Sequence, residues 1–270
     1  MLINLANSSK FQYIGINGFI VSFIGVLLLG IVIGSFLNVC IYRIPLKEDI
    51  AVEPSHCMKC GHRLKWYELI PLFSYIIQGG KCRSCKQHIS IQYPLVELGN
   101  GLLWILILYI WGLQWVTIVY CVCTSIMIVI SVIDERTKEI NIFLNLSILL
   151  LGAIRVALDY TNWIYYIIGL FAISIPFLII VLVSKERAMG LGDVYLMAGA
   201  GLLLGWKHVI LATVLGCIIG SVVHILRMKI SKKSKELAFG PYLCTGIYIA
   251  IVFGWPMINW YFSLFSKTNI

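Results

Sequence analysis

Two aspartates, Asp134 and Asp193, stand at the ends of apolar runs that are long enough to cross a membrane. The second completes the sequence Gly190-Leu191-Gly192-Asp193, in which two glycines come just before the acid. Glycine lets another backbone approach closely, so a substrate strand could lie beside this carboxylate. An aspartyl protease needs two carboxyl groups near one water, one ionised and the other protonated. The pair therefore predicts peptide hydrolysis, with Gly190 and Gly192 binding substrate or supporting the site.

Four cysteines form two Cys-x-x-Cys pairs, Cys57 with Cys60 and Cys82 with Cys85. Each pair can sit in a tight turn that points two thiolates at one ion, and two such turns complete a tetrahedral zinc site. Two disulfides are the alternative, but a reducing compartment disfavours them. With four thiolate ligands the zinc has no open position for water, so it would hold the loop folded. Three nearby histidines are interpreted as ordinary loop residues: His56, His62 and His88.

The composition, with 60% hydrophobic and only 12% charged residues, is typical of a polytopic membrane protein. We expect an all-α fold of about eight transmembrane helices. The expected spans are 15–41, 95–113, 115–133, 140–157, 163–183, 207–226 and 241–265, with a shorter one at 194–205. The short span is rich in small residues, which suits a helix packed inside a bundle. The first span is interpreted as a permanent helix and not as a cleaved leader.

Lysine and arginine predict the orientation, because short loops rich in them stay in the cytoplasm. Seventeen of the 21 fall in four segments that eight spans place on one face, namely 42–94, 134–140, 184–190 and 227–240. Both aspartates and the cysteine loop are then expected at the cytoplasmic face, with both termini outside. The formal charge of +9 is explained by this topology, so we expect anionic lipids as partners and no nucleic acid. The basic residues expected at lipid headgroups are Arg227, Lys229, Lys232, Lys233 and Lys235.

Three domains are expected from these patterns. Residues 1–41 contain the first transmembrane helix, and residues 42–94 form a cytoplasmic loop domain around the four cysteines. Residues 95–270 form the helix bundle that carries the two aspartates.

Several motifs occur together, in order, over most of the chain. They are Gly34-Ser35-Phe36-Leu37-Asn38-Val39-Cys40-Ile41-Tyr42-Arg43-Ile44-Pro45, the two cysteine pairs, Trp66-Tyr67-Glu68-Leu69-Ile70-Pro71, Tyr93-Pro94-Leu95-Val96-Glu97, Asp134, the glycine motif at 190–193 and Phe239-Gly240-Pro241-Tyr242-Leu243. In these motifs the chain resembles the type IV prepilin peptidases, the membrane aspartyl proteases that process prepilins and pseudopilins.

The resemblance implies a bacterial inner-membrane enzyme with eight spans and Asp134 and Asp193 as its catalytic pair. In that family the cut falls after a glycine at the end of a short basic leader. Many members with the cysteine loop also methylate the new amino terminus with S-adenosylmethionine. The sequence leaves open whether the substrates belong to a type IV pilus, a type II secretion pseudopilus or a competence filament. It also leaves open which aspartate is the base, because such a pair titrates as a unit.

Three further positions are predicted with alternatives. Glu97 could hold the methyl donor or the new amino group of the substrate, or it could form an ion pair with an arginine such as Arg43. Thr137 is a candidate cap for the helix that follows Asp134. The four-residue spacing of Gly30, Gly34 and Asn38 favours close helix packing over substrate contact.

Two rival functions belong to other classes. A protein that only transfers methyl groups would leave the acid pair at the span ends unexplained, and no glycine-rich nucleotide-binding motif occurs in the loop. A transporter would carry ions through acids at the membrane midplane. Here the aspartates are expected at the span ends, which favours the peptidase.

Overall fold

The computed structural model describes residues 15–230 and 238–266 and is built mainly from helices. Among these residues, six helices are long and apolar enough to cross a membrane. Two shorter apolar helices, Ile142–Leu158 and Leu191–Leu204, lie where the sequence predicted two further spans. The predicted all-α class is therefore confirmed, and the helix count agrees roughly. Five of the basic residues used in the topology argument lie outside the described residues: Lys10, Lys232, Lys233, Lys235 and Lys267.

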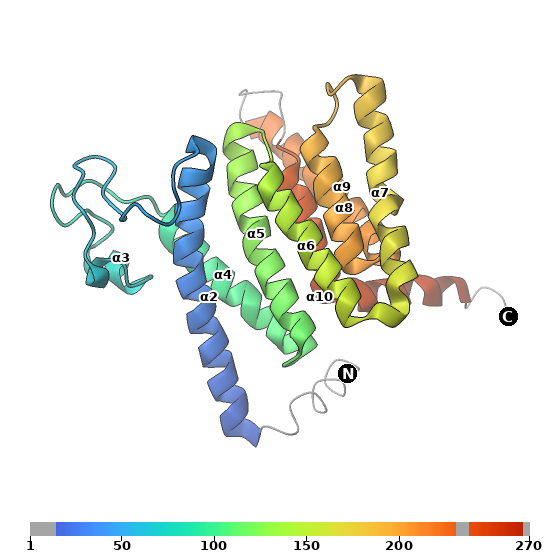
Figure 1. The fold of residues 1–270 in the computed structure, drawn as a ribbon, viewed down its shortest axis with the longest axis horizontal. Coiled ribbons are helices and arrows are strands. Elements are labelled where there is room, and N and C mark those ends of the chain that lie inside the picture. Colours follow the sequence, from blue (N-terminus) through green and yellow to red (C-terminus); the bar gives the residue numbers. More distant parts are fainter. Residues whose placement is uncertain (1–14, 231–237, 267–270) are drawn as a thin grey trace. The chain divides into compact units, whose positions relative to one another are not determined.

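Figure 1 shows the helices in chain order. They are α2 (Gly15–Leu46), η1 (Trp66–Glu68), α3 (Phe73–Ile77), α4 (Gln92–Trp111), α5 (Trp115–Thr137), α6 (Ile142–Leu158), η2 (Tyr160–Asn162), α7 (Trp163–Ser184), α8 (Leu191–Leu204), α9 (Trp206–Ile230) and α10 (Gly240–Ser266). The chain divides into two compact units, unit 1 (Met1–Thr117) and unit 2 (Ile118–Ile270). Unit 1 holds α2 to α4 with the cysteine loop, and unit 2 holds most of α5 and all of α6 to α10.

In unit 1, α2 and α4 pack so closely that glycine is required at their contact. A Cβ atom built on Gly30 would lie 2.8 Å from the Cα atom of Gly101, and one on Gly34 would lie 2.7 Å from the Cα atom of Glu97. The Asn100 side chain donates a 2.7 Å hydrogen bond to the carbonyl of Gly30 across the same contact. The predicted packing role of the glycines is thus confirmed.

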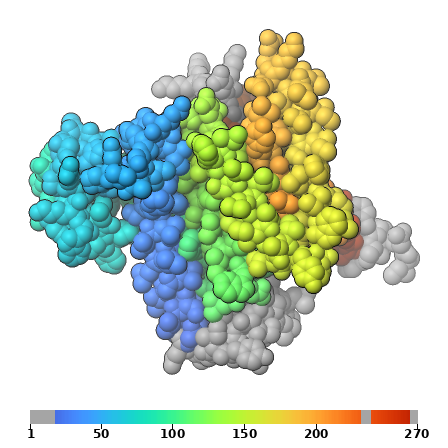
Figure 2. Space-filling view, viewed as in Figure 1, coloured from blue at the N-terminus to red at the C-terminus, as the bar shows by residue number. Residues whose placement is uncertain are grey.

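The loop between α2 and α4 forms a compact body in unit 1 (Figure 2). Helix α2 continues to Leu46, past the predicted boundary at residue 41, because hydropathy marks the apolar part of a helix while its backbone hydrogen bonds continue into polar sequence. The buried Arg43 guanidinium donates hydrogen bonds to the carbonyls of Asp49 at 2.9 Å and of Glu53 at 2.9 Å. One buried side chain thus fixes the first turn of the loop.

In unit 2, the short helix α8 lies at the centre of the bundle, where α6, α7 and α9 contact it. Small residues make this possible, since Gly201 approaches the backbone of Gly169 in α7 and Gly199 approaches Ile148 in α6. Nearly all of α8 from Asp193 onward is buried. The expectation that this small-residue segment packs inside the bundle is confirmed.

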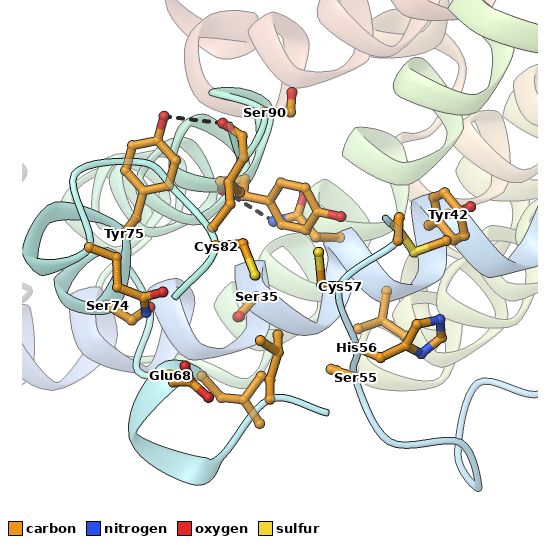
Figure 3. A pocket seen from close by; sticks show the side chains of 18 of the residues that line it. Ser35, Tyr42, Ser55, His56, Cys57, Glu68, Ser74, Tyr75, Cys82 and Ser90 are labelled. Atoms are coloured by element: carbon orange, nitrogen blue, oxygen red, sulfur yellow. Dashed lines mark hydrogen bonds between the residues drawn. The ribbon is translucent and has the colours of Figure 1, made fainter. Parts of the chain in front are cut away.

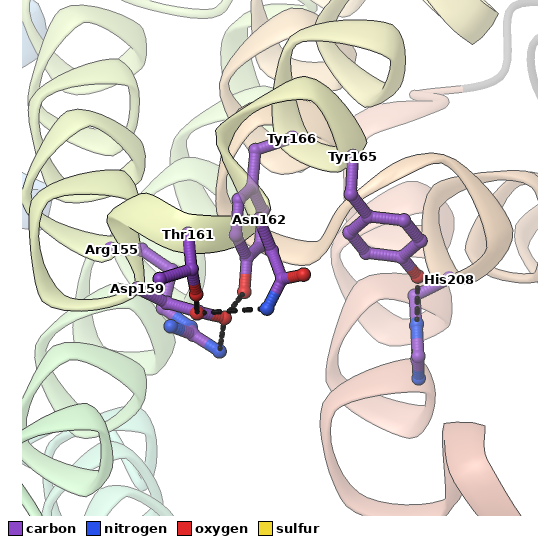
Figure 4. Close-up of polar contacts among 7 residues, drawn as sticks. All are labelled: Arg155, Asp159, Thr161, Asn162, Tyr165, Tyr166 and His208. Atoms are coloured by element: carbon purple, nitrogen blue, oxygen red, sulfur yellow. Dashed lines mark hydrogen bonds and ion pairs between the residues drawn. The ribbon is translucent and has the colours of Figure 1, made fainter.

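Polar side chains organise the turn between α6 and α7 (Figure 4). The Asp159 carboxylate accepts hydrogen bonds from the Tyr166 hydroxyl at 2.7 Å and the Asn162 amide at 2.9 Å. It also lies 3.5 Å from a guanidinium nitrogen of Arg155. The Thr161 hydroxyl donates a further hydrogen bond to it at 3.2 Å. Four side chains from two helices and the turn therefore converge on one carboxylate just before α7 begins.

The cap predicted for the helix after Asp134 is wrong. Helix α6 begins after Asn141, whose side chain accepts a 2.8 Å hydrogen bond from the backbone N–H of Phe143. The Thr137 hydroxyl instead donates to the carbonyl of Ile133 at 3.0 Å, one turn back in α5. Asparagine and threonine are both good caps, so residue type did not distinguish them. Helix α5 ends at Thr137, and the non-helical residues 138–141 lead to the next helix.

Candidate active site and candidate metal centre

Asp134 lies in the last turn of α5, as the apolar run predicted, and only 5% of its surface is exposed. Its Oδ2 atom accepts a 2.9 Å hydrogen bond from the backbone N–H of Gly240, the first residue of α10. Since the first N–H groups of a helix have no partner within the helix, this carboxylate satisfies one of them. A residue more than a hundred positions away in the chain therefore positions Asp134.

Asp193 is the third residue of α8, and the residue that caps this helix is Gly190. Asp193 is therefore not a simple N-cap, and it is 7% exposed. The Asn145 amide of α6 donates a 3.0 Å hydrogen bond to the carbonyl of Gly192. A Cβ atom on Gly192 would lie 2.9 Å from the Cβ atom of Ile140. Gly192 thus allows the start of α8 to pack against the segment after α5.

The two carboxyl groups lie close enough for the charge of Asp134 to act on Asp193. Cys244 of α10 lies near both of them. Ile140 lies between the residues next to Asp193 and the residue that bonds Asp134, because it contacts both Gly192 and Gly240. Two buried carboxyl groups in one electrostatic environment favour a shared proton, because both cannot ionise cheaply. This is the arrangement that activates a water against a peptide carbonyl.

Beside this site, Glu135 forms an ion pair of 2.7 Å with Arg227 of α9. Arg227, one of the basic residues expected at lipid headgroups, contacts this carboxylate and keeps an exposed side chain. The ion pair joins the C-terminal ends of α5 and α9 next to Asp134.

Sequence reasoning missed two residues of this site, Asn145 and Gly240. Asn145 is 2% exposed in an apolar helix, and a buried amide in a membrane span is itself a signal of function or of a specific contact. Gly240 was part of a recognised motif, but its N–H hydrogen bond depends on the tertiary fold and has no sequence signal.

The four predicted metal ligands come together in unit 1. The Sγ atoms of Cys57, Cys60, Cys82 and Cys85 all lie within 4.8 Å of one another. The Cys57–Cys85 pair is separated by 3.9 Å and the Cys60–Cys82 pair by 4.0 Å. A tetrahedral ion with metal–sulfur bonds of about 2.3 Å needs sulfurs about 3.8 Å apart. The separations fit a bound metal ion, and all four cysteines are free of disulfides.

The two cysteine turns have matching backbones. In one turn, Gly61 donates its N–H to the carbonyl of Cys57 at 2.9 Å, and in the other, Lys86 donates to the carbonyl of Cys82 at 2.9 Å. Each turn is closed by an isolated β-bridge, His56 with Arg63 and Lys81 with His88. Backbone N–H groups of Lys59 and then Cys60 lower the pKa of the Cys57 thiol to about 6, which favours the thiolate that metals bind.

The nearby histidines stay outside this cluster. His62 lies 3.3 Å from the Glu68 carboxylate, and His56 lies 3.3 Å from the carbonyl of Pro54. The backbone N–H of Lys65 and then His62 lower the pKa of Glu68. The interpretation of these histidines as ordinary loop residues is consistent with these contacts.

A cavity of about 380 Å³ lies within unit 1 (Figure 3). Its lining includes Tyr42, Tyr75, Asn38, Glu68 and Glu97, together with Cys57 and Cys82 of the metal centre. Two buried acceptor atoms in the lining, Asn38 Oδ1 and Glu68 Oε1, have no hydrogen-bond partner among the described residues. Because a buried acceptor without a donor is costly, this lining suits a ligand that brings positive charge or N–H groups.

Glu97 is buried near the start of α4, and its Oε2 atom accepts a 2.8 Å hydrogen bond from the backbone N–H of Leu72. The alternative of an ion pair with Arg43 is wrong, because that guanidinium donates to loop carbonyls. Leu72 has a φ of 61°, a conformation that is uncommon for a leucine. The Glu97 carboxylate therefore holds a strained loop backbone at the edge of the cavity.

Comparison with known proteins agrees with this division of the chain. Residues 28–111 match the family model of the bacterial peptidase A24 N-terminal domain, and residues 121–225 match the type IV leader peptidase family. Relatives named prepilin leader peptidase/N-methyltransferase occur in Pseudomonas putida, 30% identical over 84% of this chain and 88% of the relative, and in Pseudomonas aeruginosa, 31% identical over 84% and 89%. A relative of the same name from Myxococcus xanthus is 33% identical over 74% of this chain and 61% of its own length. No solved structure matches the chain.

Proposed function

Because this chain belongs to the type IV leader peptidase family, we propose that Asp134 and Asp193 are the catalytic pair of a prepilin leader peptidase. The protein is a multi-pass membrane enzyme that cleaves prepilin-type substrates and carries the N-methyltransferase activity named in its relatives. The observation that supports the catalytic pair is the burial of two carboxyl groups, from α5 and α8, on either side of Ile140, which lies against both Gly192 and Gly240. Membership of this family disfavours the transporter and the methyltransferase without peptidase activity.

In the proposed reaction, the ionised aspartate takes a proton from a water, and the water oxygen attacks the carbonyl carbon of the leader glycine. The protonated aspartate donates a hydrogen bond to the carbonyl oxygen as it becomes tetrahedral. That intermediate breaks its carbon–nitrogen bond, and a proton goes to the leaving amine. Gly190, where an added Cβ atom would meet only the backbone nitrogen of Gly192 at 3.9 Å, leaves room for the substrate backbone near Asp193, and Gly192 supports the site by packing against Ile140. No covalent bond to the enzyme is required.

We further propose that the cavity of unit 1 holds the methyl donor. S-adenosylmethionine, when bound, supplies an electrophilic methyl group on a positively charged sulfonium. The unpartnered acceptors Asn38 Oδ1 and Glu68 Oε1 fit its positive charge and amino group, and Tyr42 and Tyr75 offer faces to an aromatic base. A volume of about 380 Å³ is in the range of small-molecule sites. Glu97 is placed to orient the ligand and to accept a proton from an incoming amine.

The metal of the cysteine cluster is proposed to be zinc, because four thiolates in tetrahedral spacing are typical of structural zinc sites. All four positions are taken by sulfur, so the ion would fold the loop and take no part in cleavage. Cys57 and Cys82 also line the cavity. The zinc therefore supports the wall of the proposed methyl-donor site.

The loop and the aspartates are proposed to lie on the cytoplasmic side of the bacterial inner membrane, as the distribution of lysine and arginine indicates. The exposed Lys229 and other basic residues at that face then meet anionic lipids. Electron paramagnetic resonance of a spin label at position 229 should show contact with anionic but not with neutral vesicles. Whether the substrates serve pili, secretion or DNA uptake depends on the prepilins that the cell makes.

The test uses the purified enzyme in detergent with a prepilin-like peptide and labelled S-adenosylmethionine. Asp134→Asn and Asp193→Asn should each lose cleavage by at least about a thousandfold, because either carboxyl group alone cannot complete the proton transfer. Both variants should still methylate a peptide that has already been cleaved. Normal cleavage by either variant would show that the peptidase site lies elsewhere.

A further inference from the structure

Gly240 makes the direct contact with the Asp134 carboxylate. Its backbone N–H lies 2.9 Å from Oδ2, in a buried position at the start of α10. The carbonyl of the preceding residue, Phe239, already accepts the N–H groups of Tyr242 and Leu243. The N–H of Gly240 is therefore one of the first helix donors, which have no partner inside the helix and carry its positive dipole end. A carboxylate that accepts such a bond is favoured in its ionised form.

The absence of a side chain at position 240 is part of the same contact. A Cβ atom built there would lie 2.8 Å from Oδ2 and 3.2 Å from Cγ of Asp134, and 3.2 Å from Cδ1 of Ile140. The first distance is shorter than real Cβ contacts, so any larger residue would displace the carboxylate or Ile140. Ile140 in turn contacts Gly192, so it has little room to move. Only glycine fits between Asp134 and Ile140 without such a shift.

The other charged groups around the pair act unequally on the two aspartates. Lys138 acts on Asp134 with an attractive charge and Glu135 with a repulsive one, but Glu135 is neutralised by its 2.7 Å ion pair with Arg227. The negative charge of Asp134 disfavours a charge on Asp193, and the backbone of Gly190 favours it; the thiol of Cys244 lies near both carboxyl groups. A lysine and a fixed N–H group therefore favour the negative charge on Asp134.

We propose that Gly240 is a positioning residue that keeps Asp134 ionised, so that Asp134 is the general base of cleavage and Asp193 is the group that carries the shared proton. The proposal rests on the catalytic pair proposed above and assigns the two roles within it. Since the N–H group is part of the backbone, it cannot titrate or rotate away. The base therefore has a fixed orientation, with Oδ2 held by the helix start and Oδ1 left to take a proton from the water.

Two variants distinguish the effect of the Gly240 N–H group from the effect of the missing side chain at position 240. Gly240→Ala keeps the donor and adds a Cβ atom, whereas Gly240→Pro also removes the donor, at a first helical position that tolerates proline. The measurement is the pH dependence of kcat/KM for leader cleavage in detergent. Gly240→Ala should lower kcat at least about tenfold with KM unchanged, because the carboxylate is displaced. Gly240→Pro should in addition move the acidic limb of the profile up by about one pH unit or more relative to Gly240→Ala.

The matched control is Gly25→Ala, since a Cβ atom at this helical glycine would meet nothing within 4 Å. Its profile should be that of the unmodified enzyme. An acidic limb for Gly240→Pro equal to that for Gly240→Ala would overturn the proposal. Should Gly240→Pro fail to fold, Gly240→Ala with Ile140→Val gives a second test. The smaller side chain should restore kcat, and an unrestored kcat would also count against the positioning role.

The Asp134→Asn variant distinguishes failure of the proposed catalytic pair from failure of the role proposed for Gly240. If it cleaves normally, the proposed catalytic pair is wrong. If it is inactive while Gly240→Pro keeps the wild-type pH profile, the pair stands and only the role of Gly240 is wrong.

Discussion

At the scale of single residues, the two cysteine turns differ in one informative position. The residue after the second cysteine has a φ of 68° in one turn, where it is Gly61, and of 60° in the other, where it is Lys86. Both donate the N–H that closes the turn around a cysteine pair. The left-handed conformation costs nothing for glycine but about 1 kcal/mol or more for other residues. Lys86 therefore holds a strained backbone next to Cys85.

This strain predicts that Lys86→Gly will strengthen metal binding. Relief of about 1 kcal/mol corresponds to about a fivefold gain in affinity, measured by competition with a zinc-binding dye. Gly61→Ala should produce a loss of similar size. Lys86→Ala is the matched control, because it removes the charge but not the strain. A gain in Lys86→Ala as large as that in Lys86→Gly would mean that charge and not backbone conformation is responsible.

The site residues that sequence could predict are those whose type and spacing carry the chemistry. Asp134, Asp193 and the four cysteines were in this class. Carboxylates at span ends and paired cysteines are seldom needed for packing alone, so their presence indicates a chemical role. Gly240 could not be assigned a role, since its contribution is a backbone N–H whose partner is distant in sequence. The partner of Arg43 was also unpredictable, because backbone carbonyls leave no sequence signal.

At the scale of elements, apolar run length predicted the helices but not their ends. Helix α2 continues past the predicted boundary at residue 41 to Leu46, and α6 begins after Asn141 and not after Thr137. Hydropathy reports burial in lipid, whereas a helix ends where its backbone hydrogen bonds find other partners. The small residues of α8 did predict its central place, because close packing demands them.

The turn between α6 and α7 allows a prediction about pH. The Tyr166 hydroxyl, and then the Asn162 amide and Arg155, lower the pKa of Asp159. A carboxyl group whose pKa is lower in the folded state stabilises the fold above its unfolded pKa of about 3.9. That stability is lost as the pH falls through the folded pKa, when the carboxylate takes up a proton.

The variant Asp159→Asn removes this titration while keeping the shape of the side chain. Its melting temperature at pH 7 should be about 2–4 °C below that of the unmodified enzyme. The difference should shrink as the pH falls below about 4, measured by thermal unfolding in detergent. The control is Thr161→Val, which removes only the weakest of the three hydrogen bonds, at 3.2 Å. A difference that stays constant down to pH 3 would show that the charge of Asp159 contributes nothing.

At the scale of the whole molecule, the two chemical centres belong to different compact units. The cysteine cluster and the cavity lie in unit 1, and the two aspartates lie in unit 2. The family matches divide at nearly the same place, since one ends at residue 111 and the other begins at residue 121. Each unit packs through its own glycine contacts, α2 with α4 in unit 1 and α7 with α8 in unit 2. We therefore expect that loss of structure around the cysteine cluster and cavity of unit 1 leaves the aspartate site of unit 2 folded.

This division predicts that metal removal affects the two activities differently. A strong chelator should unfold the cysteine turns, because the proposed ion would join the segment that holds Cys57 and Cys60 to the segment that holds Cys82 and Cys85. The cavity wall containing Cys57 and Cys82 would then be lost, so methylation of an already cleaved peptide should fall at least about tenfold. Cleavage should fall by less than about threefold, because Asp134 and Asp193 depend on contacts within unit 2. Added zinc should restore methylation, and magnesium, which prefers oxygen ligands, should not.

The variant Cys85→Ser should reproduce the effect of the chelator without adding any reagent. Its matched control is Cys217→Ser, because Cys217 is an exposed, free cysteine of α9 outside the cluster, and this change should leave both activities intact. The two rates are followed in one reaction, as release of the leader and as transfer of labelled methyl groups. A parallel fall of both rates in Cys85→Ser, with the helices retained by circular dichroism, would show that the metal centre supports cleavage as well. Cleavage by the aspartates of unit 2 would then depend on the folded cysteine loop of unit 1.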